Sequence, residues 1–221
     1  MADDPEVELE ASTDFNFFNE LTRKSVHLLV LLIPLTYHVL NFDLWIIQLA
    51  LLATLVFFIP LEFYRLRINP NFWLNYLTRQ AEKTEPANYV VVSIVWFLIL
   101  LGVNLFYSIE MAEMAIVSTH LGDSLAALFG RGLGKNRLPL TEGKTIEGYI
   151  AGVLGTYSLA WIFLSWLGIP SLLLPVLPAL VVGLFDFFEN LPFWAADNLI
   201  HPGVTVFVIF ILDMVGILHY L

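Results

Sequence analysis

The sequence predicts an all-α integral membrane protein, a bundle of six to seven transmembrane helices with a Gly- and Lys-rich loop on the cytosolic side. Of the 221 residues, 58% are hydrophobic and only 14% are charged. The mean hydropathy is +0.78, which is far above that of an ordinary soluble domain. Most apolar stretches approach the roughly 20 residues that cross a bilayer as helix. They cover residues 26–40, 43–61, 88–107, 111–130, 146–168, 171–188 and 203–221.

The ends and interruptions of these stretches define the domain organisation. Residues 1–20 carry seven acidic side chains, so we predict a solvated, disordered leader. The leader lacks the positive n-region of a signal peptide. Residues 21–221 then form one polytopic membrane domain. Within it the first stretch is short, and the sixth contains Pro175 and Pro178, which a helix inside a bundle tolerates.

Charge placement predicts the orientation. All ten Lys and Arg residues fall in the N-terminal flank, in the loop at 62–87 or in the loop at 131–145. If seven helices alternate, these three segments share one side of the membrane. The positive-inside rule makes that side cytoplasmic. The loop at 131–145 would then meet cytosolic solutes.

Asp123 is the first candidate for chemistry. It stands within an apolar segment, residues 115–129, and a carboxylate inside a membrane helix is by default a functional hypothesis. The alternatives are an acid that reaches water at a helix end, or a partner of Arg131. His120 would be its neighbour on a helix, and we favour a polar contact there over metal binding.

The following loop is typical of a phosphate-binding segment. Its glycines allow backbone amides to approach phosphates, and its basic side chains neutralise them. It is not a Walker A loop, because Leu138 stands where the first glycine is required. It is not a dinucleotide fingerprint either, because no strand precedes it. An ordinary loop that carries bases only for topology remains an alternative.

The run from Gly143 to Gly148 begins the next apolar stretch. Thr145 is a candidate N-cap and Glu147 lies near the positive end of that helix, so capping is an alternative to ligand binding for both. Gly148 and Gly152 form a small-xxx-small pair, for which we expect helix packing.

A second polar segment, residues 186–198, contains Asp186, Glu189 and Asp197 without any Lys or Arg. Acids gathered in this way need a cation or a basic partner. Together with Asp123 they could hold Mg²⁺ for a nucleotide, although pairing with the basic loop would also satisfy them. The chain has no cysteine, which excludes disulfides, thiol nucleophiles and zinc–thiolate sites.

Four motifs resemble known families. GDSLAALFGRGLGK at 122–135 and GKTIEG at 143–148 resemble the core shared by two CTP-using membrane families. One is the polyprenol kinase family, with dolichol kinase, phytol kinase and CTP-dependent diacylglycerol kinase; the other is phosphatidate cytidylyltransferase. RKSVH at 23–27 and the run from Glu189 to ADNLIHP at 196–202 are similar to the kinase family. Ala196 is a departure, because many relatives carry an acid there.

The resemblance implies transfer of the γ-phosphoryl group of CTP to the hydroxyl of a membrane alcohol, either an isoprenoid alcohol (dolichol, polyprenol or phytol) or diacylglycerol. It implies Mg²⁺ or another divalent cation, and no nucleic-acid partner is expected. The catalytic candidates are Asp123, Lys144 and Asp197. The metal candidates are Asp123, Glu189 and Asp197. The nucleotide-binding candidates are Arg23, Lys24, His27, Gly122, Gly130, Arg131, Gly134, Lys135, Gly143, Lys144, Thr145 and Glu147.

Two other functions stay open at this point. The first is a CTP:phosphatidate cytidylyltransferase, which would make a CDP-lipid. The second is a non-enzymatic transporter or lipid-binding protein whose acids bind ions. No inverted repeat is visible in the sequence, and the charged groups gather at one predicted face, which argues against transport.

Overall fold

The computed structural model describes residues 24–69, 108–139, 144–185 and 200–215, together with residues 72, 94, 96–100, 102 and 141. Within these residues every regular element is a helix, and one isolated antiparallel bridge joins Arg137 to Thr145. The all-helical prediction is therefore confirmed for this part of the chain. The predictions for the leader at 1–20 and for the segment at 186–198 lie outside it.

The N-terminal apolar stretch forms one helical run that changes type twice. It begins at Lys24 and contains the 3-10 helix η1 (Val26–Leu31), the short α2 (Leu32–Pro34) and the π-helical η2 (Leu35–Val39). Pro34 has no backbone N–H and cannot continue a regular ladder, so a change of helix type beside it is expected. Asn41, at a φ of 54°, then reverses the chain, a conformation that asparagine tolerates.

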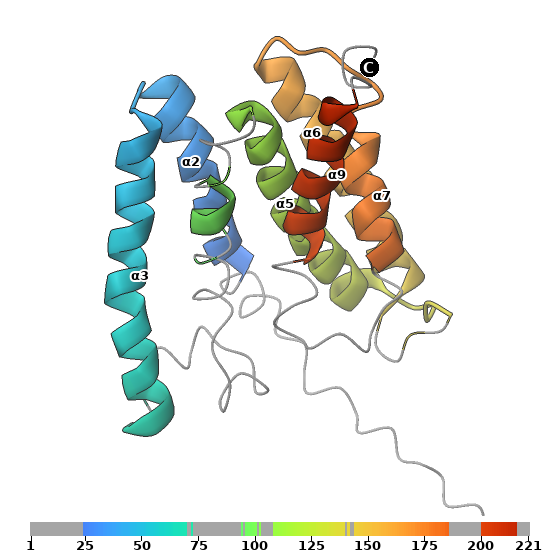
Figure 1. Cartoon of the computed structure of the whole chain (residues 1–221). Coiled ribbons are helices and arrows are strands. Elements are labelled where there is room, and N and C mark those ends of the chain that lie inside the picture. Colours follow the sequence, from blue (N-terminus) through green and yellow to red (C-terminus); the bar gives the residue numbers. More distant parts are fainter. Residues whose placement is uncertain are drawn as a thin grey trace, which may run out of the picture.

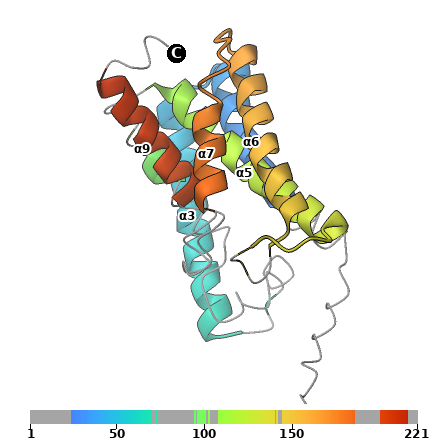
Figure 2. The same ribbon diagram turned by 90° about the vertical axis from the view of Figure 1, so that its right-hand side faces the viewer.

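The next helix, α3 (Leu44–Arg67), stands at one side of the molecule, and α2 lies between it and the remaining helices (Figure 1). The remaining helices are α5 (Ile109–Leu133), α6 (Ile146–Trp166), α7 (Val176–Phe185) and α9 (His201–Met214). They form a single group, in which α7 lies between α6 and α9 (Figure 2). Residues 96–100 are also helical.

Glycines bring α5 and α6 into backbone contact. A Cβ added to Gly148 would lie 2.8 Å from the Gly130 Cα and 2.9 Å from the Ala126 carbonyl oxygen. A Cβ added to Gly122 would lie 1.9 Å from the Thr156 Oγ1 and 3.2 Å from the Gly152 carbonyl oxygen. Small residues allow such close approach. The packing role expected for Gly148 and Gly152 is confirmed.

Helix α5 is the centre of the molecule, because residues 112–120 are buried on every face. Ile116 and Val117 pack with Val30, Ile47 and Trp96, which joins α5 to the N-terminal run, α3 and residues 96–100. On its other side, α5 packs against α6, α9 and the turn before α7 through a second cluster of buried side chains: Met114, Ala115, Ala160, Phe163, Leu164, Leu174 and Ile209.

Two helices in the described part of the chain, α3 and α6, are long and apolar enough to cross a membrane. Helix α5 is 25 residues long but carries more charge. Helix α7 begins later than the predicted stretch at 171–188. It begins only at Val176, because residues 171–175 turn and Ser171 accepts the backbone N–H groups of Leu173 and Leu174. Pro175 therefore precedes α7.

Candidate functional site

Asp123 and Lys24 form an ion pair, with the Lys24 Nζ on the Asp123 Oδ2. Lys24 comes from the beginning of the N-terminal run and Asp123 from the second half of α5, 99 positions later. Lys24 is only 3% exposed, and the Asp123 side chain is 16% exposed. Two residues that the sequence singled out separately are thus brought together at one place. From the sequence, Arg131 was one possible partner for Asp123. In the structure, Lys24 forms the ion pair with Asp123.

His120 lies one turn before Asp123 on α5 and is buried. The Trp96 Nε1 donates a hydrogen bond to its Nε2 at 3.2 Å, and its Nδ1 lies 2.9 Å from the Ile116 carbonyl oxygen. Because the indole N–H can only donate, this pattern fixes the neutral tautomer with its proton on Nδ1. Both nitrogens of His120 are used, and their partners are Trp96 and Ile116 rather than Asp123, with which we expected the polar contact.

The loop between α5 and α6 is folded back on itself. Leu138 N donates to the Lys144 carbonyl at 2.9 Å, and Ile146 N donates to the Asn136 carbonyl at 2.9 Å. The Asn136 Nδ2 also donates to the Glu147 carboxylate at 2.7 Å. This contact ties the loop to the first turn of α6. Glu147 has a structural partner here in addition to its predicted role toward a ligand.

Thr145 is the N-cap of α6, as one reading of the sequence predicted. Its Oγ1 accepts the Gly148 N–H at 3.2 Å and donates to the Gly130 carbonyl at 3.4 Å. A Cβ on Gly134 would lie 2.5 Å from the same hydroxyl oxygen. The predicted nucleotide-binding residues Gly130, Gly134 and Thr145 thus meet at one junction.

Four basic residues lie in the segment that forms this junction. Arg131, Lys135 and Arg137 are exposed, while Lys144 is half-buried just before the first turn of α6. The dipole of a helix favours an anion at its N-terminus, and in α6 the Ile146 and Gly148 N–H groups already donate to Asn136 and Thr145. The arrangement suits a phosphate group on chemical grounds.

The site has two levels along α5. Gly122, beside Asp123, contacts Thr156 of α6, whereas Gly130 contacts Gly148. Eight residues of helix separate Gly122 from Gly130, which corresponds to about 12 Å. The ion pair therefore lies deeper between the helices than the basic loop. A ligand that uses both levels must be elongated.

The described residues do not by themselves form the predicted magnesium site. No group of three or more His, Asp or Glu side chains gathers within them. Asp123 supplies the hard oxygen that Mg²⁺ prefers, but its Oδ2 contacts Lys24. The other metal candidates, Glu189 and Asp197, lie outside the described residues. So do Arg23, Gly143 and the side chain of His27.

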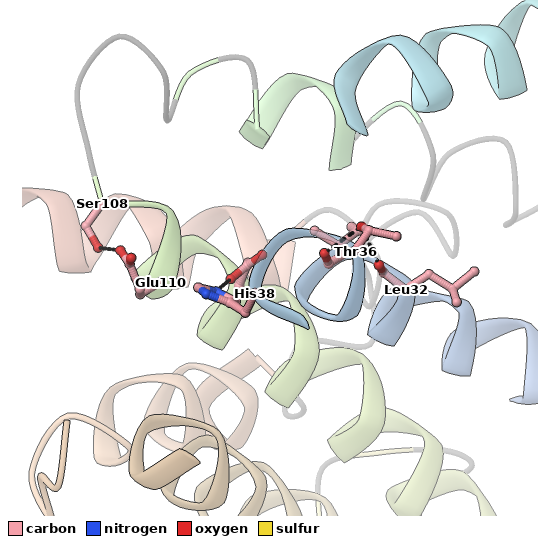
Figure 3. Close-up of polar contacts among 7 residues, drawn as sticks. Leu32, Thr36, His38, Ser108 and Glu110 are labelled. Atoms are coloured by element: carbon pink, nitrogen blue, oxygen red, sulfur yellow. Dashed lines mark hydrogen bonds and ion pairs between the residues drawn. The ribbon is translucent and has the colours of Figure 1, made fainter. Parts of the chain in front are cut away.

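Sequence reasoning missed a second polar pair, between His38 and Glu113. The Nε2 of His38 (labelled in Figure 3) lies 2.6 Å from the Glu113 Oε2. The Glu113 side chain is buried. Within the described residues, the Glu113 Oε1 has no hydrogen-bond partner. The rule that singled out Asp123, an acid in an apolar stretch, applies equally to Glu113 and would have found it.

His201 is the second residue that the sequence analysis passed over. It opens α9, is only 2% exposed, and packs beside Phe185. Neither ring nitrogen has a hydrogen-bond partner within the described part of the chain. His201 lies in the motif ADNLIHP, four residues after Asp197, and its place in that motif could have identified it as a candidate.

Comparison with known proteins bears on this site. A model of the cytidylyltransferase family matches residues 10–193, more than four fifths of the chain. The match includes Lys24, Asp123 and the whole loop from α5 to α6. No curated protein and no solved structure matches the chain.

Proposed function

Because the chain belongs to the cytidylyltransferase family, we propose that it is a CTP-using enzyme of the membrane, and specifically a lipid-alcohol kinase. In this proposal it transfers the γ-phosphoryl group of CTP to the hydroxyl of a membrane isoprenoid alcohol or diacylglycerol. The enzyme is multi-pass, and its active face is cytoplasmic, on the side of the basic loop.

The exposed apolar surface supports a membrane environment. Helix α3 leaves large apolar side chains uncovered, among them Val56 at 66% and Phe57 at 63% exposure. Helix α6 does the same with Leu154 at 60%. Contiguous apolar surfaces of this kind mark contact with lipid or another protein. Both helices also have the length and composition of membrane spans.

The observation that carries the kinase proposal is the ion pair between Lys24 and Asp123. Asp123 belongs to the core motif that resembles both CTP-using families. Lys24 belongs to RKSVH, the motif that resembles the kinases alone. Their contact supports the view that the kinase-type motif contributes to the same site as the shared core.

The chemistry assigns a task to each level of the site. The acceptor hydroxyl forms a bond to the γ-phosphorus, the bond from that phosphorus to the β–γ bridging oxygen breaks, and CDP leaves. The hydroxyl proton must go to a carboxylate or to solvent. At the deeper level of the site, among the residues that the structure describes, Asp123 is the carboxylate that could accept it. Lys135 and Lys144 neutralise phosphate charge, since phosphoryl transfer depends mainly on positioning and electrostatics.

A bound Mg²⁺ would supply further neutralisation of phosphate charge. Asp123, Glu189 and Asp197 are the carboxylates proposed to hold it.

A cytidylyltransferase is the second candidate, and the description of the matched family favours it. In that reaction the lipid phosphate would form a bond to the α-phosphorus of CTP, and pyrophosphate would leave. The basic loop would serve either reaction. The two reactions differ in the phosphorus that ends on the lipid.

Labelled CTP separates the candidates. Purified protein in lipid nanodiscs is incubated with lipid alcohol or phosphatidate and with CTP labelled at either the γ- or the α-phosphate. The kinase proposal expects lipid label only from the γ position. Label from the α position would establish the cytidylyltransferase instead, and no transfer from either position would support the non-enzymatic reading.

A further inference from the structure

An apolar groove of about 330 Å³ lies between the N-terminal helical run and α3. Leu29 and Ile33 line one side, Ile47 and Ala50 line the other, and Trp96 contributes to the lining. Trp96, Ile33 and Ile47 are buried, whereas Leu29 is 54% exposed. The groove is therefore closed on its inner side and open at its flank.

The polar groups of the groove are already satisfied by their own helices. The Thr36 Oγ1 donates to the Leu32 and Ile33 carbonyls at 2.7 and 2.9 Å (Figure 3). The Thr54 Oγ1 donates to the Ala50 carbonyl at 2.8 Å. With these hydrogen bonds made, the lining offers little to water or to a polar ligand. The groove suits a hydrocarbon.

Two connections lead from the groove to the ion pair. Trp96 donates to His120, which lies one turn before Asp123 on α5. Leu29 follows Lys24 by five residues in the same helical run, which corresponds to roughly 8–10 Å. The groove therefore starts near the candidate site and continues away from it, toward Thr36 and Phe42.

We propose that this groove holds the hydrocarbon chain of the acceptor lipid, with the hydroxyl end at Lys24 and Asp123. The inference rests on the proposed function and adds to it the place where the chain binds. The volume lies at the lower end of the range of small-molecule sites. Two turns of an α-helix, about 10 Å across and 11 Å long, need far more space than about 330 Å³, and the apolar lining gives a charged headgroup no partner. A single alkyl or prenyl chain fits this volume and needs no polar partner.

The test fills the groove without changing the ion pair. Ala50→Phe adds a benzyl-sized side chain to the lining, and Ala53→Phe makes the same change on the same helix at a position outside the lining. Both alanines are exposed, so both variants are expected to fold. For Ala50→Phe we expect the KM for a long-chain prenyl alcohol to rise about tenfold or more, because several methylenes lose their contacts. The KM values for CTP and for a short-chain prenyl alcohol should stay within about twofold, and Ala53→Phe should leave all three unchanged.

A second measurement does not depend on turnover. A prenyl alcohol with a diazirine in its tail is photolysed with the protein in nanodiscs without CTP, and the labelled peptides are mapped by mass spectrometry. We expect label on the peptides of Ile33 and Trp96, and its loss in Ala50→Phe but not in Ala53→Phe.

The two measurements fail in different ways. If the wild type transfers γ-phosphate but the label maps elsewhere, or if Ala50→Phe and Ala53→Phe act alike, the groove assignment is overturned while the proposed function stands. If no phosphate is transferred but the label maps to the groove and Ala50→Phe removes it, the chain-binding site stands and the kinase proposal falls.

Discussion

Removing the Lys24–Asp123 ion pair one partner at a time should destabilise the protein more than removing both partners together. In Asp123→Asn, the Lys24 ammonium would remain, 3% exposed, and would lose its ion pair with the Asp123 carboxylate. Breaking a buried pair from one side costs about 3–5 kcal/mol, whereas replacing both charges by uncharged groups is often close to neutral. In Lys24→Met the cost should be smaller, about 2 kcal/mol, because the Asp123 side chain is 16% exposed and keeps some access to water.

The assay is thermal unfolding of the purified variants in one detergent at one scan rate, since unfolding of such proteins is commonly irreversible. For a chain of this size 1 kcal/mol corresponds to roughly 2–4 °C. We expect the Tm to fall by about 6–20 °C in Asp123→Asn. In the double variant Lys24→Met/Asp123→Asn, the Tm should return to within about 4 °C of the wild type.

Activity should not follow stability in this series. The double variant should be nearly as stable as the wild type. Its turnover should nevertheless stay at least about a hundredfold lower, because a charged group at the reacting centre is missing. Strictly additive Tm changes in the double variant would show that the two side chains do not interact. Full activity in the stable double variant would remove both residues from the catalytic site.

Three further outcomes follow from the junction of α5 with α6. Gly148→Ala drives a Cβ into the backbone of α5 and should cost about 1–3 kcal/mol. Gly155→Ala meets only a flexible leucine methyl and should cost less than about 1 kcal/mol; equal Tm values for these two variants would contradict the backbone contact. Thr145→Val should lose the N-cap and about 1 kcal/mol, and Thr145→Ser should restore it, so equal loss in both would exclude capping. Lys144→Ala should reduce CTP turnover at least about tenfold with little change in Tm, and unchanged turnover would leave Lys144 as a topology residue only.

Local sequence patterns predicted the helices because their causes are local. Apolar runs between polar segments indicated α3 and α6, and Thr145 before an apolar run indicated the start of α6. The spacing of Gly148 and Gly152 indicated a packed face. These features depend on neighbouring residues in the chain, so they can be read without a structure.

Contacts between distant segments could not be predicted in this way. Lys24 and Asp123 were each singled out, but nothing local indicates that a lysine at the beginning of the first helical run meets a carboxylate 99 positions later. The same holds for His38 and Glu113, which are 75 positions apart. Such pairs depend on how α5 sits between the N-terminal run and α6.

Helix ends were predicted less well than helix centres. The beginning of the apolar stretch at 171–188 contains no charge to mark a helix end, yet α7 begins only at Val176. The side chain of Ser171 stabilises a turn there. Competition of this kind between a turn and a helix is decided by individual hydrogen bonds, which composition does not reveal.

The most direct measurement of the central claim is the identity of the small product released with each lipid modified. Wild-type protein in nanodiscs is given CTP, Mg²⁺ and either a long-chain prenyl alcohol or phosphatidate, and CDP and pyrophosphate are quantified beside the lipid product. The kinase account predicts CDP in a one-to-one ratio with lipid monophosphate, without pyrophosphate, and loss of both products in Asp123→Asn. Pyrophosphate released in step with a CDP-lipid from phosphatidate, with no CDP from the alcohol, would contradict it.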